Sequence, residues 1–416
     1  MKKFYLLCLA VSGILLLSAM PTAKSILFAD SYMLRSSGVE AAYWNPARLS
    51  ENRHTDLWLP GLNSAVMVSN NALDLDTYNY FVSCDTLHVV DKERLLQDVK
   101  GMLSLASEGS ASIFGFTMGN TALSASGRVY VKGHIAEDIL RLALYGNTED
   151  SYYFDKATVN ASAMAYSDLS YSAGGFDLPF LPPSIPAIKA GFSVSALVGM
   201  SNLETRKFQA SFSTDADSGT NVQQEMILRT STYGLGYKVM LGLYSKVLPK
   251  LETGITLDNI AGRIRWLGDN EERYYHIAID SLYASNIEED FYEQTDEIIE
   301  IDSYSTSLPP ELRLAAKYDL GFMDVSADWV QGFKESTVTR ATGRLSCAAG
   351  FKPLPFLPLS FGISFPNSTL PLKTSYSIGI SSRMQEFAIG IQSYNSIIPG
   401  YKSKGVSLAT SMRFWF

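Results

Sequence analysis

The carboxyl-terminal residues alternate strictly between apolar side chains and side chains that are mostly small or polar. The apolar face comprises Val406, Leu408, Thr410, Met412, Phe414 and Phe416, and the opposite face comprises Ser407, Ala409, Ser411, Arg413 and Trp415. Successive side chains of a β-strand point to opposite faces of its sheet, so a period of two predicts a strand. An apolar face opposed by a small or polar face is typical of a strand that separates lipid from a wet interior.

The same alternation returns along the chain, for example over residues 123–132, 188–196 and 311–318. A single strand of this kind could belong to a soluble sandwich, but many of them with charged residues on one face favour a wide barrel. The fourteen predicted strands lie near 57–69, 110–118, 121–133, 156–174, 187–213, 222–245, 251–279, 305–319, 322–334, 337–351, 358–366, 371–382, 384–394 and 403–416. An even count is typical of single-chain bacterial barrels, and 12 or 16 strands stay open as alternatives. The predicted fold class is therefore all-β, a single antiparallel transmembrane barrel.

The amino terminus carries the features of a secretory signal peptide. Lys2 and Lys3 precede an apolar run over residues 4–20, and Ala23-Lys24-Ser25 offers small residues for cleavage. A membrane anchor is the alternative, and Pro21 together with the short apolar run disfavours it. No later stretch reaches about 18 consecutive apolar residues, so a mature chain could cross a membrane only as a closed barrel. We predict a signal peptide at 1–25, a hatch segment at 26–50 and a barrel at 51–416.

Composition and motif searches exclude several functions. The formal charge of −8 without a basic block argues against nucleic-acid binding. Cys84 and Cys347 are too few for a disulfide framework, and we expect no bridge between them. The four histidines lack metal-ligand spacing, and neither a Gly-x-Ser-x-Gly nor a phosphate-binding loop motif occurs. We therefore expect no enzyme activity, no cofactor and no metal site.

Long connections alternate with short ones. The long set, at 70–109, 134–155, 214–221 and 280–304, is expected on the outer side of the membrane. Apolar residues at helical spacing predict two short helices within these loops, near 91–106 and 135–146. The segment 269–302 holds twelve Asp or Glu and one Arg, which predicts a solvated loop. Divalent-cation binding is the alternative, although the Asp-x-Asp-x-Asp-Gly spacing is absent.

Alternation also assigns charged residues to the lumen. The inward cations would be Arg128, Lys132, Lys189, Lys238, Arg263, Arg265, Arg313, Lys317, Arg340, Arg344 and Arg413. The inward carboxylates would be Asp168, Glu252, Asp258, Glu311 and Asp328. The excess of cations could attract an anionic head group. We favour the alternative that these residues form ion pairs that brace the barrel and hold the hatch.

A motif between the signal peptide and the first strand carries a family resemblance. Gly38 is followed by Tyr43-Trp44-Asn45-Pro46-Ala47, in which Pro46 keeps Asn45 out of the helical region and predicts a rigid turn. This segment resembles the FadL/PorV-like superfamily of outer-membrane barrels, and residues 308–314 with 325–329 look like a strand pair of PorV-like members. The resemblance implies a 14-stranded barrel whose amino-terminal segment enters the lumen as a hatch.

The resemblance implies two functions. FadL-like members take up hydrophobic or amphipathic molecules such as fatty acids, whereas PorV-like members anchor or shuttle protein cargo for a secretion system. We expect the first function, with the second as the alternative, and a location in the outer membrane of a Gram-negative bacterium. The expected partners are outer-membrane lipid, the barrel-assembly machinery, and either a hydrophobic small molecule or a secretion-system protein. The predicted assembly signal comprises Leu408, Met412, Phe414 and Phe416.

Overall fold

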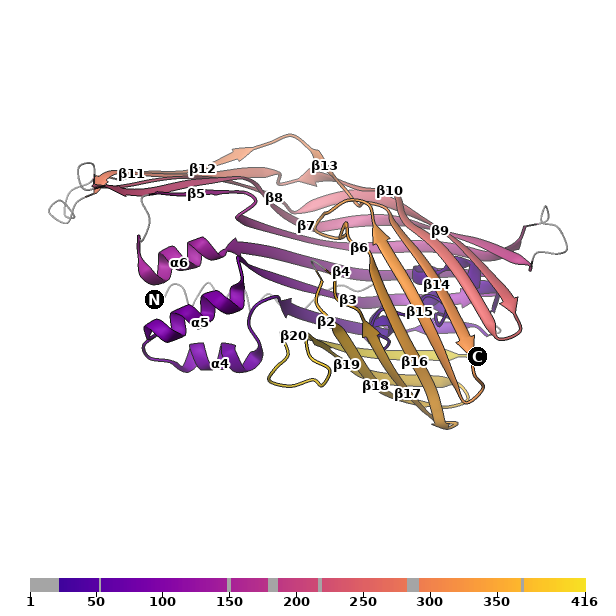
Figure 1. Ribbon diagram of the computed structural model, residues 1–416. Helices are drawn as coiled ribbons and strands as arrows, with labels where there is room; N and C mark the ends of the chain where they lie inside the picture. Colours follow the sequence, from indigo (N-terminus) through magenta and orange to yellow (C-terminus); the bar gives the residue numbers. More distant parts are fainter. Residues whose placement is uncertain are drawn as a thin grey trace.

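The computed structural model describes residues 22–51, 54–147, 151–178, 186–215, 219–282, 292–367 and 370–416. Its main feature is a closed antiparallel barrel of 14 strands, which confirms the predicted fold class (Figure 1). The wall contains, in order, β1 (Asp56–Trp58) with β2 (Ser64–Asn70), β3 (Met102–Met118), β4 (Thr121–Ala136), β6 (Val159–Asp177), β7 (Ile188–Asp215), β9 (Tyr233–Leu248), β10 (Leu251–Gly268), β14 (Glu311–Asp319), β15 (Met323–Gly332), β16 (Arg344–Leu354), β17 (Leu357–Ser364), β18 (Lys373–Ser381), β19 (Gln385–Tyr394) and β20 (Gly405–Trp415). Segments β1 and β2 together form the first wall strand.

The barrel closes where its first and last strands pair. Leu57 of β1 lies opposite Phe414 of β20, and β2 pairs with β20 further along. The ladder extends to Phe416, whose amide donates to the carbonyl of Thr55 at 3.0 Å. Because β20 also pairs with β19, the wall has no free edge there, and its backbone polar groups are satisfied without water.

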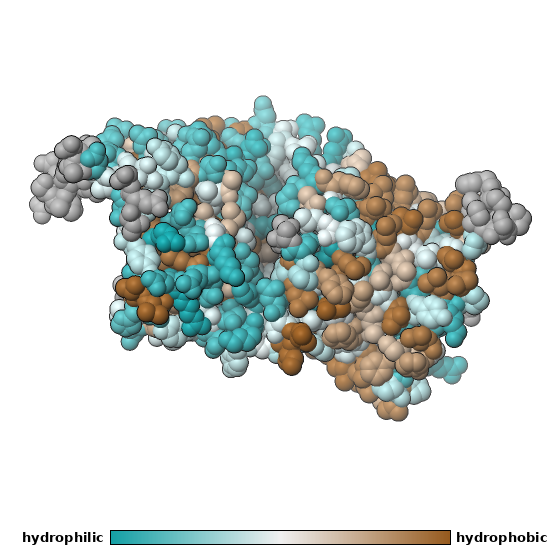
Figure 2. Space-filling model, viewed as in Figure 1, coloured by the Kyte–Doolittle hydropathy of each residue, from teal (hydrophilic) through white to brown (hydrophobic). Residues whose placement is uncertain are grey.

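An apolar band surrounds the barrel. Ile255, Leu314, Trp329 and Leu345 lie on four adjacent strands as direct cross-strand neighbours, and each is exposed. Figure 2 shows hydrophobic side chains gathered over the barrel wall on one half of the molecule. The predicted alternation of β20 is present, since Leu408 is exposed while its neighbours Ser407 and Ala409 are buried. These surfaces fit a wall that faces lipid, and the fold supports placement in an outer membrane.

Residues 22–51 fill the lumen as a plug. This segment contains α2 (Ala23–Ile26), η1 (Gly38–Glu40), α3 (Ala41–Trp44) and η2 (Pro46–Glu51), and most of its residues are buried. Figure 1 shows it inside the barrel wall. The described plug begins four residues before the predicted hatch, because Thr22 to Ser25 also pack inside.

Three helices gather at the end of the barrel that carries the long loops. They are α4 (Leu75–Ser83), α5 (Val89–Val99) and α6 (Glu137–Tyr145), and Figure 1 places them together. Helices α5 and α6 match the two predicted ones, whereas α4 was not predicted and residues 102–106 belong to β3. The Tyr80 hydroxyl of α4 donates to Asp91 of α5 at 2.7 Å, and this bond raises the pKa of Tyr80 to about 12.

A sheet projects beyond the barrel at the same end. It consists of β5 (Ser151–Asp155), the second half of β7, β8 (Gly219–Ser231), β11 (Glu271–Leu282) and β12 (Tyr292–Glu300), while β13 (Tyr304–Ser307) extends β14. The 28 residues of β7 span roughly 90 Å at strand geometry, far more than a bilayer core of about 30 Å. Two predicted strands, 222–245 and 251–279, each divide into a barrel part and a projecting part. Residues 280–304, predicted as a long loop, contain all of β12.

The two ends of the barrel differ. Short turns, such as those joining β9 to β10 and β14 to β15, lie opposite the end with the helices and the projecting sheet. In barrels of this kind short turns face the periplasm, so we call the two ends periplasmic and outer. Within the described residues, no helix is long and apolar enough to cross a bilayer. Cys84 and Cys347 are free thiols.

A charge placed on the apolar band should destabilise the barrel. Ile378 of β18 is 51% exposed and pairs with Ile389, so Ile378→Arg would put a cation into lipid. We expect a loss of about 2 kcal/mol or more of unfolding free energy in phospholipid vesicles, measured by denaturant titration. Ile398→Arg is the control, because this exposed residue lies in an outer loop. Equal stability of the two variants would contradict the assignment of the band.

Candidate functional site

The Asn45-Pro46-Ala47 turn anchors the plug to the wall. The Asn45 side chain accepts a hydrogen bond from the Ala47 amide at 3.1 Å and donates one to the Leu243 carbonyl of β9 at 2.9 Å. The first bond fixes the turn and the second ties it to a strand. One amide side chain therefore serves both purposes, as a donor and an acceptor on neighbouring atoms.

Three glycines on consecutive strands make room for this turn. A Cβ atom at Gly191 would lie 2.4 Å from the Ala47 nitrogen, and one at Gly174 would lie 1.7 Å from the Pro46 carbonyl oxygen. A Cβ at Gly242 would lie 2.2 Å from Asn45 Oδ1. Any side chain at these positions would displace the plug backbone, so the wall is shaped to receive it.

The aromatic residues of the motif extend the anchor. The Tyr43 hydroxyl donates to Asp168 Oδ1 at 3.0 Å, and its ring stacks on Trp58 at a centroid distance of 5.9 Å. The guanidinium of Arg313 lies 4.7 Å from the Trp44 ring centroid, within cation–π range. Tyr43 and Trp44 thus contact residues of β1, β6 and β14, which lie on different sides of the plug.

Charged wall residues hold the remainder of the plug. Asp328 of β15 accepts from the Ser31 hydroxyl at 2.7 Å and from the Met33 amide at 3.0 Å. Arg48 of the plug pairs with Glu252 of β10 at 2.7 Å, and Lys317 of β14 pairs with the same carboxylate at 3.0 Å. These contacts join the plug to β10, β14 and β15.

A second segment enters the lumen from the outer side. Residues 333–343, between β15 and β16, were predicted as strand in part, but they fold inward, and Thr339 is buried. Lys132 of β4 pairs with Glu335 at 3.2 Å and donates to the Ser336 carbonyl at 2.7 Å. Strand β4 is the third wall strand and β15 the ninth, so this segment crosses nearly the full width of a 14-strand ring. We call residues 333–343 the strap.

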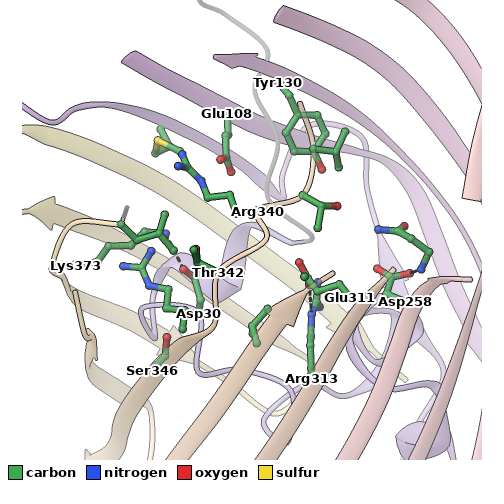
Figure 3. Close-up of a pocket in the computed structure, with 18 of the residues that line it drawn as sticks. Asp30, Glu108, Tyr130, Asp258, Glu311, Arg313, Arg340, Thr342, Ser346 and Lys373 are labelled. Carbon is green, nitrogen blue, oxygen red and sulfur yellow. Dashed lines mark hydrogen bonds and ion pairs between the residues drawn. The ribbon is translucent and has the colours of Figure 1, made fainter. Parts of the chain in front are cut away.

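A cavity of about 180 Å³ lies between the plug and the strap (Figure 3). Asp30 and Trp44 of the plug border it, as do Thr339 and Arg340 of the strap. A larger outer vestibule of about 500 Å³ also touches the strap. Ser69, Arg340 and Pro371 line both spaces, so the cavity and the vestibule adjoin each other.

The predicted lumen residues fall into four groups. Arg128, Arg313, Arg340 and Arg344 line the cavity, and Lys132 lines the vestibule. Lys317, Asp328 and Arg413 contact the plug. The expectation fails for Arg263 and Arg265, which are exposed on the outer surface.

The alternation of β10 itself explains that failure. Thr256 and Asp258 are buried on the inward face, and Ile264 and Trp266, which are also even-numbered, are fully buried. Register shifts on both sides of Ile260 each add one residue, so the second restores the alternation that the first inverts. Arg263 and Arg265 occupy odd-numbered positions and therefore lie on the outward face.

Comparison with known proteins gives the chain a family. Residues 46–258 match the profile of a family described as "Family of unknown function (DUF5723)". The chain belongs to this DUF5723 family. No curated protein matches it.

Solved structures share the fold of this DUF5723 protein. The toluene transporter TbuX of Ralstonia pickettii aligns with a TM-score of 0.50 and 12% identity, covering 91% of this chain and 94% of TbuX. A FadL homologue of Pseudomonas aeruginosa gives 0.47 and 12%, covering 96% and 99%, and the toluene transporter TodX of P. putida gives 0.43 and 12%, covering 91% and 94%. The TbuX alignment confirms the FadL-like barrel fold that the sequence resembles.

Two features of the DUF5723 site were missed by sequence reasoning. The strap was read as strand, although Gly332 and Gly343 at its ends mark a break: a Cβ at Gly332 would lie 2.2 Å from the Arg340 carbonyl oxygen. The other feature is the buried aromatic pair of Tyr130 and Tyr166, whose ring centroids lie 6.1 Å apart. The sequence placed both residues in predicted strands but did not indicate that their rings meet.

A larger side chain at one of the glycines that contact the plug should weaken the packing of the plug. Gly191→Val places a side chain against the Ala47 backbone, and we expect higher ion conductance in planar bilayers and faster proteolysis of residues 22–51. Gly127→Val is the matched control, because a Cβ at Gly127 meets nothing within 4 Å. If conductance and proteolysis of both variants equal those of the unmodified protein, the glycines do not hold the plug in place.

Proposed function

We propose that this protein takes up small amphipathic molecules through its plugged lumen. The observation that carries the proposal is the cavity between plug and strap, which adjoins an outer vestibule. A solute would enter from the vestibule, occupy the cavity and leave after the plug shifts. The FadL-like fold supports this reading, because the solved barrels described as transporters share it.

The lining of the cavity favours amphipathic solutes over plain hydrocarbons. Trp44, Tyr130 and Tyr166 supply aromatic surface, whereas Arg313 and Lys373 supply charge. A hydrocarbon would gain from the aromatic surface but would desolvate the charged groups without replacing their hydrogen bonds. A molecule with one polar and one apolar part can hydrogen-bond with the charged residues and also pack against the aromatic ones.

Tethering the plug should stop uptake. Ser31 Oγ of the plug lies 2.8 Å from Ser326 Oγ of β15, so Ser31→Cys with Ser326→Cys, in a chain with Cys84 and Cys347 replaced, places two thiols across this contact. We expect oxidation to lower uptake of radiolabelled octanoate, which is amphipathic, at least five-fold in cells carrying the barrel, with recovery on reduction.

The control disulfide joins wall to wall. Ser172 and Ser193 are paired neighbours on β6 and β7 whose hydroxyl oxygens lie 2.8 Å apart, and cysteines there leave the plug free of any covalent tether. Uptake that survives oxidation of the plug tether, or that equals uptake by cells without the barrel, would contradict the proposal.

A second candidate function is docking of a protein partner, as in PorV-like barrels. The projecting sheet favours it, because within the described residues β12 pairs only with β11 and so leaves an edge free. Ile298 and Ile299 of β12 are 58% and 52% exposed beside several carboxylates. An edge with these properties suits a partner that adds a basic strand.

Reversing charge on β12 tests the docking function. Glu293→Lys with Glu297→Lys should abolish co-purification of a basic partner, if the protein anchors one, because both residues are exposed. Asp85→Lys with Asp319→Lys is the control, since these exposed carboxylates lie outside the projecting sheet. An unchanged set of co-purified outer-membrane and periplasmic proteins, identified by mass spectrometry, would remove this candidate.

The carboxyl-terminal strand is the proposed signal for the barrel-assembly machinery. Leu408 and Phe416 are exposed on the lipid side, and Phe414 lies at the closing seam opposite Leu57. A signal placed at the seam could be recognised before the first and last strands pair.

A further inference from the structure

Three buried arginines around the cavity each keep one guanidinium nitrogen without a hydrogen-bond partner. These atoms are Nη2 of Arg128, Nη1 of Arg313 and Nε of Arg344, and the three residues are only 5%, 6% and 8% exposed. They come from β4, β14 and β16, yet all three line the same space. Leaving a buried donor unpaired costs about 1–3 kcal/mol. Three such donors around one cavity indicate that an acceptor belongs there.

Existing ion pairs account for only part of each guanidinium. Arg128 Nε lies 3.2 Å from Asp168 Oδ2, and Arg313 Nε donates to Glu311 at 2.7 Å. Arg344 donates through Nη2 to the Pro371 carbonyl at 2.9 Å. Since arginine offers five donors in a fixed fork, these contacts leave further donors available to a ligand.

The remaining charges around the cavity are mostly paired. Lys373 lies 2.8 Å from Asp30, and Lys238 lies 3.5 Å from Asp258. Glu108 also lines the cavity, and Figure 3 shows Arg340 extending from the strap toward its side of the space. In all, six cations face four lining carboxylates, or five with Asp168, so the positive excess persists.

Size and apolar lining restrict the ligand. An engineered cavity of about 150 Å³ holds benzene, so a space of about 180 Å³ admits roughly one ring with a small substituent. Trp44, Tyr130, Tyr166 and Val338 provide the surface against which a ring would pack. A long alkyl chain would not fit within this space.

We propose that the cavity binds a small organic anion, namely a compact aromatic carboxylate. Its ring would pack against Tyr130 and Tyr166, and its carboxylate oxygens would accept hydrogen bonds from the unpaired arginine donors. This inference rests on the proposed uptake function and names its substrate class. A carboxylate has two oxygens with about four lone-pair sites, so it can accept hydrogen bonds from donors on more than one strand. The neutral ring alone would leave those donors unpaired.

Equilibrium binding to the purified full chain in detergent tests the proposal. The probe is benzoate, compared with benzyl alcohol as its uncharged counterpart and with inorganic phosphate as an anion without a ring. We expect saturable binding of benzoate by calorimetry, at least ten-fold tighter than binding of either comparison compound. Trp44 borders the site, so quenching of tryptophan fluorescence gives a second readout.

Two variants address the arginines separately. Arg344→Gln removes an unpaired donor, and Arg340→Gln removes a strap cation that forms no ion pair within 4 Å among the described residues. Each should weaken benzoate binding at least five-fold while benzyl alcohol binding stays unchanged. Arg340→Gln guards against misfolding, because no ion pair depends on it. Arg383→Gln, at an exposed periplasmic turn, is the control and should bind as the unmodified protein does.

The outcomes separate this inference from the proposed function. Benzoate binding no tighter than that of benzyl alcohol or phosphate, or unchanged by both variants, overturns the anion site. Uptake of octanoate without benzoate binding would do the same and leave the uptake function standing. Specific benzoate binding in a barrel that does not take up octanoate would support the site and contradict uptake.

Discussion

Contact between the plug backbone and the glycine-lined wall determines what the rest of the lumen can do. Where Gly174, Gly191 and Gly242 face the Asn45-Pro46-Ala47 turn, no side chain separates plug from strand, so the turn has a single position. Trp44, the residue just before this turn, then forms part of the floor of the cavity. The strap completes the enclosure from the outer side. A barrel without this seat would be an open pore, and the buried arginines would face water rather than a bounded space.

The sequence predicted the elements that depend on alternation and missed segments whose course depends on distant partners. Period-two patterning predicted the 14-strand barrel, and Asn45-Pro46 marked the turn that the family resemblance placed in the plug. The inward assignment of Arg263 and Arg265 ran against the alternation of their own strand, in which the buried residues Asp258, Ile264 and Trp266 are even-numbered. The strap and the projecting sheet also escaped prediction. Their courses depend on partners six strands away or on pairing with distant segments, which a single sequence does not reveal.

Charge in the lumen serves two physical purposes that the sequence could not separate. Arg48 of the plug and Lys317 of the wall share the Glu252 carboxylate, and removing this carboxylate would leave two largely buried cations without their anion. Arg128, Arg313 and Arg344 differ, because each keeps a free donor beside a cavity rather than beside another protein group. The distinction lies in geometry, not in residue type. In the sequence both sets are simply cations at inward positions, and only the packing shows which of these residues line a cavity.

The start of the plug bears on where the mature chain begins. Cleavage after Ser25, as the small residues there suggest, would remove Thr22 and Lys24. The Trp44 indole N–H donates to the Thr22 hydroxyl at 2.9 Å, and Lys24 forms an ion pair with Glu386 of β19. Removal would leave a buried indole N–H without an acceptor and a largely buried carboxylate without its cation, and both changes oppose plug seating. If the predicted signal peptide is present, the packing of Thr22 and Lys24 favours cleavage before Thr22, so that the residues supporting Trp44 remain with the barrel.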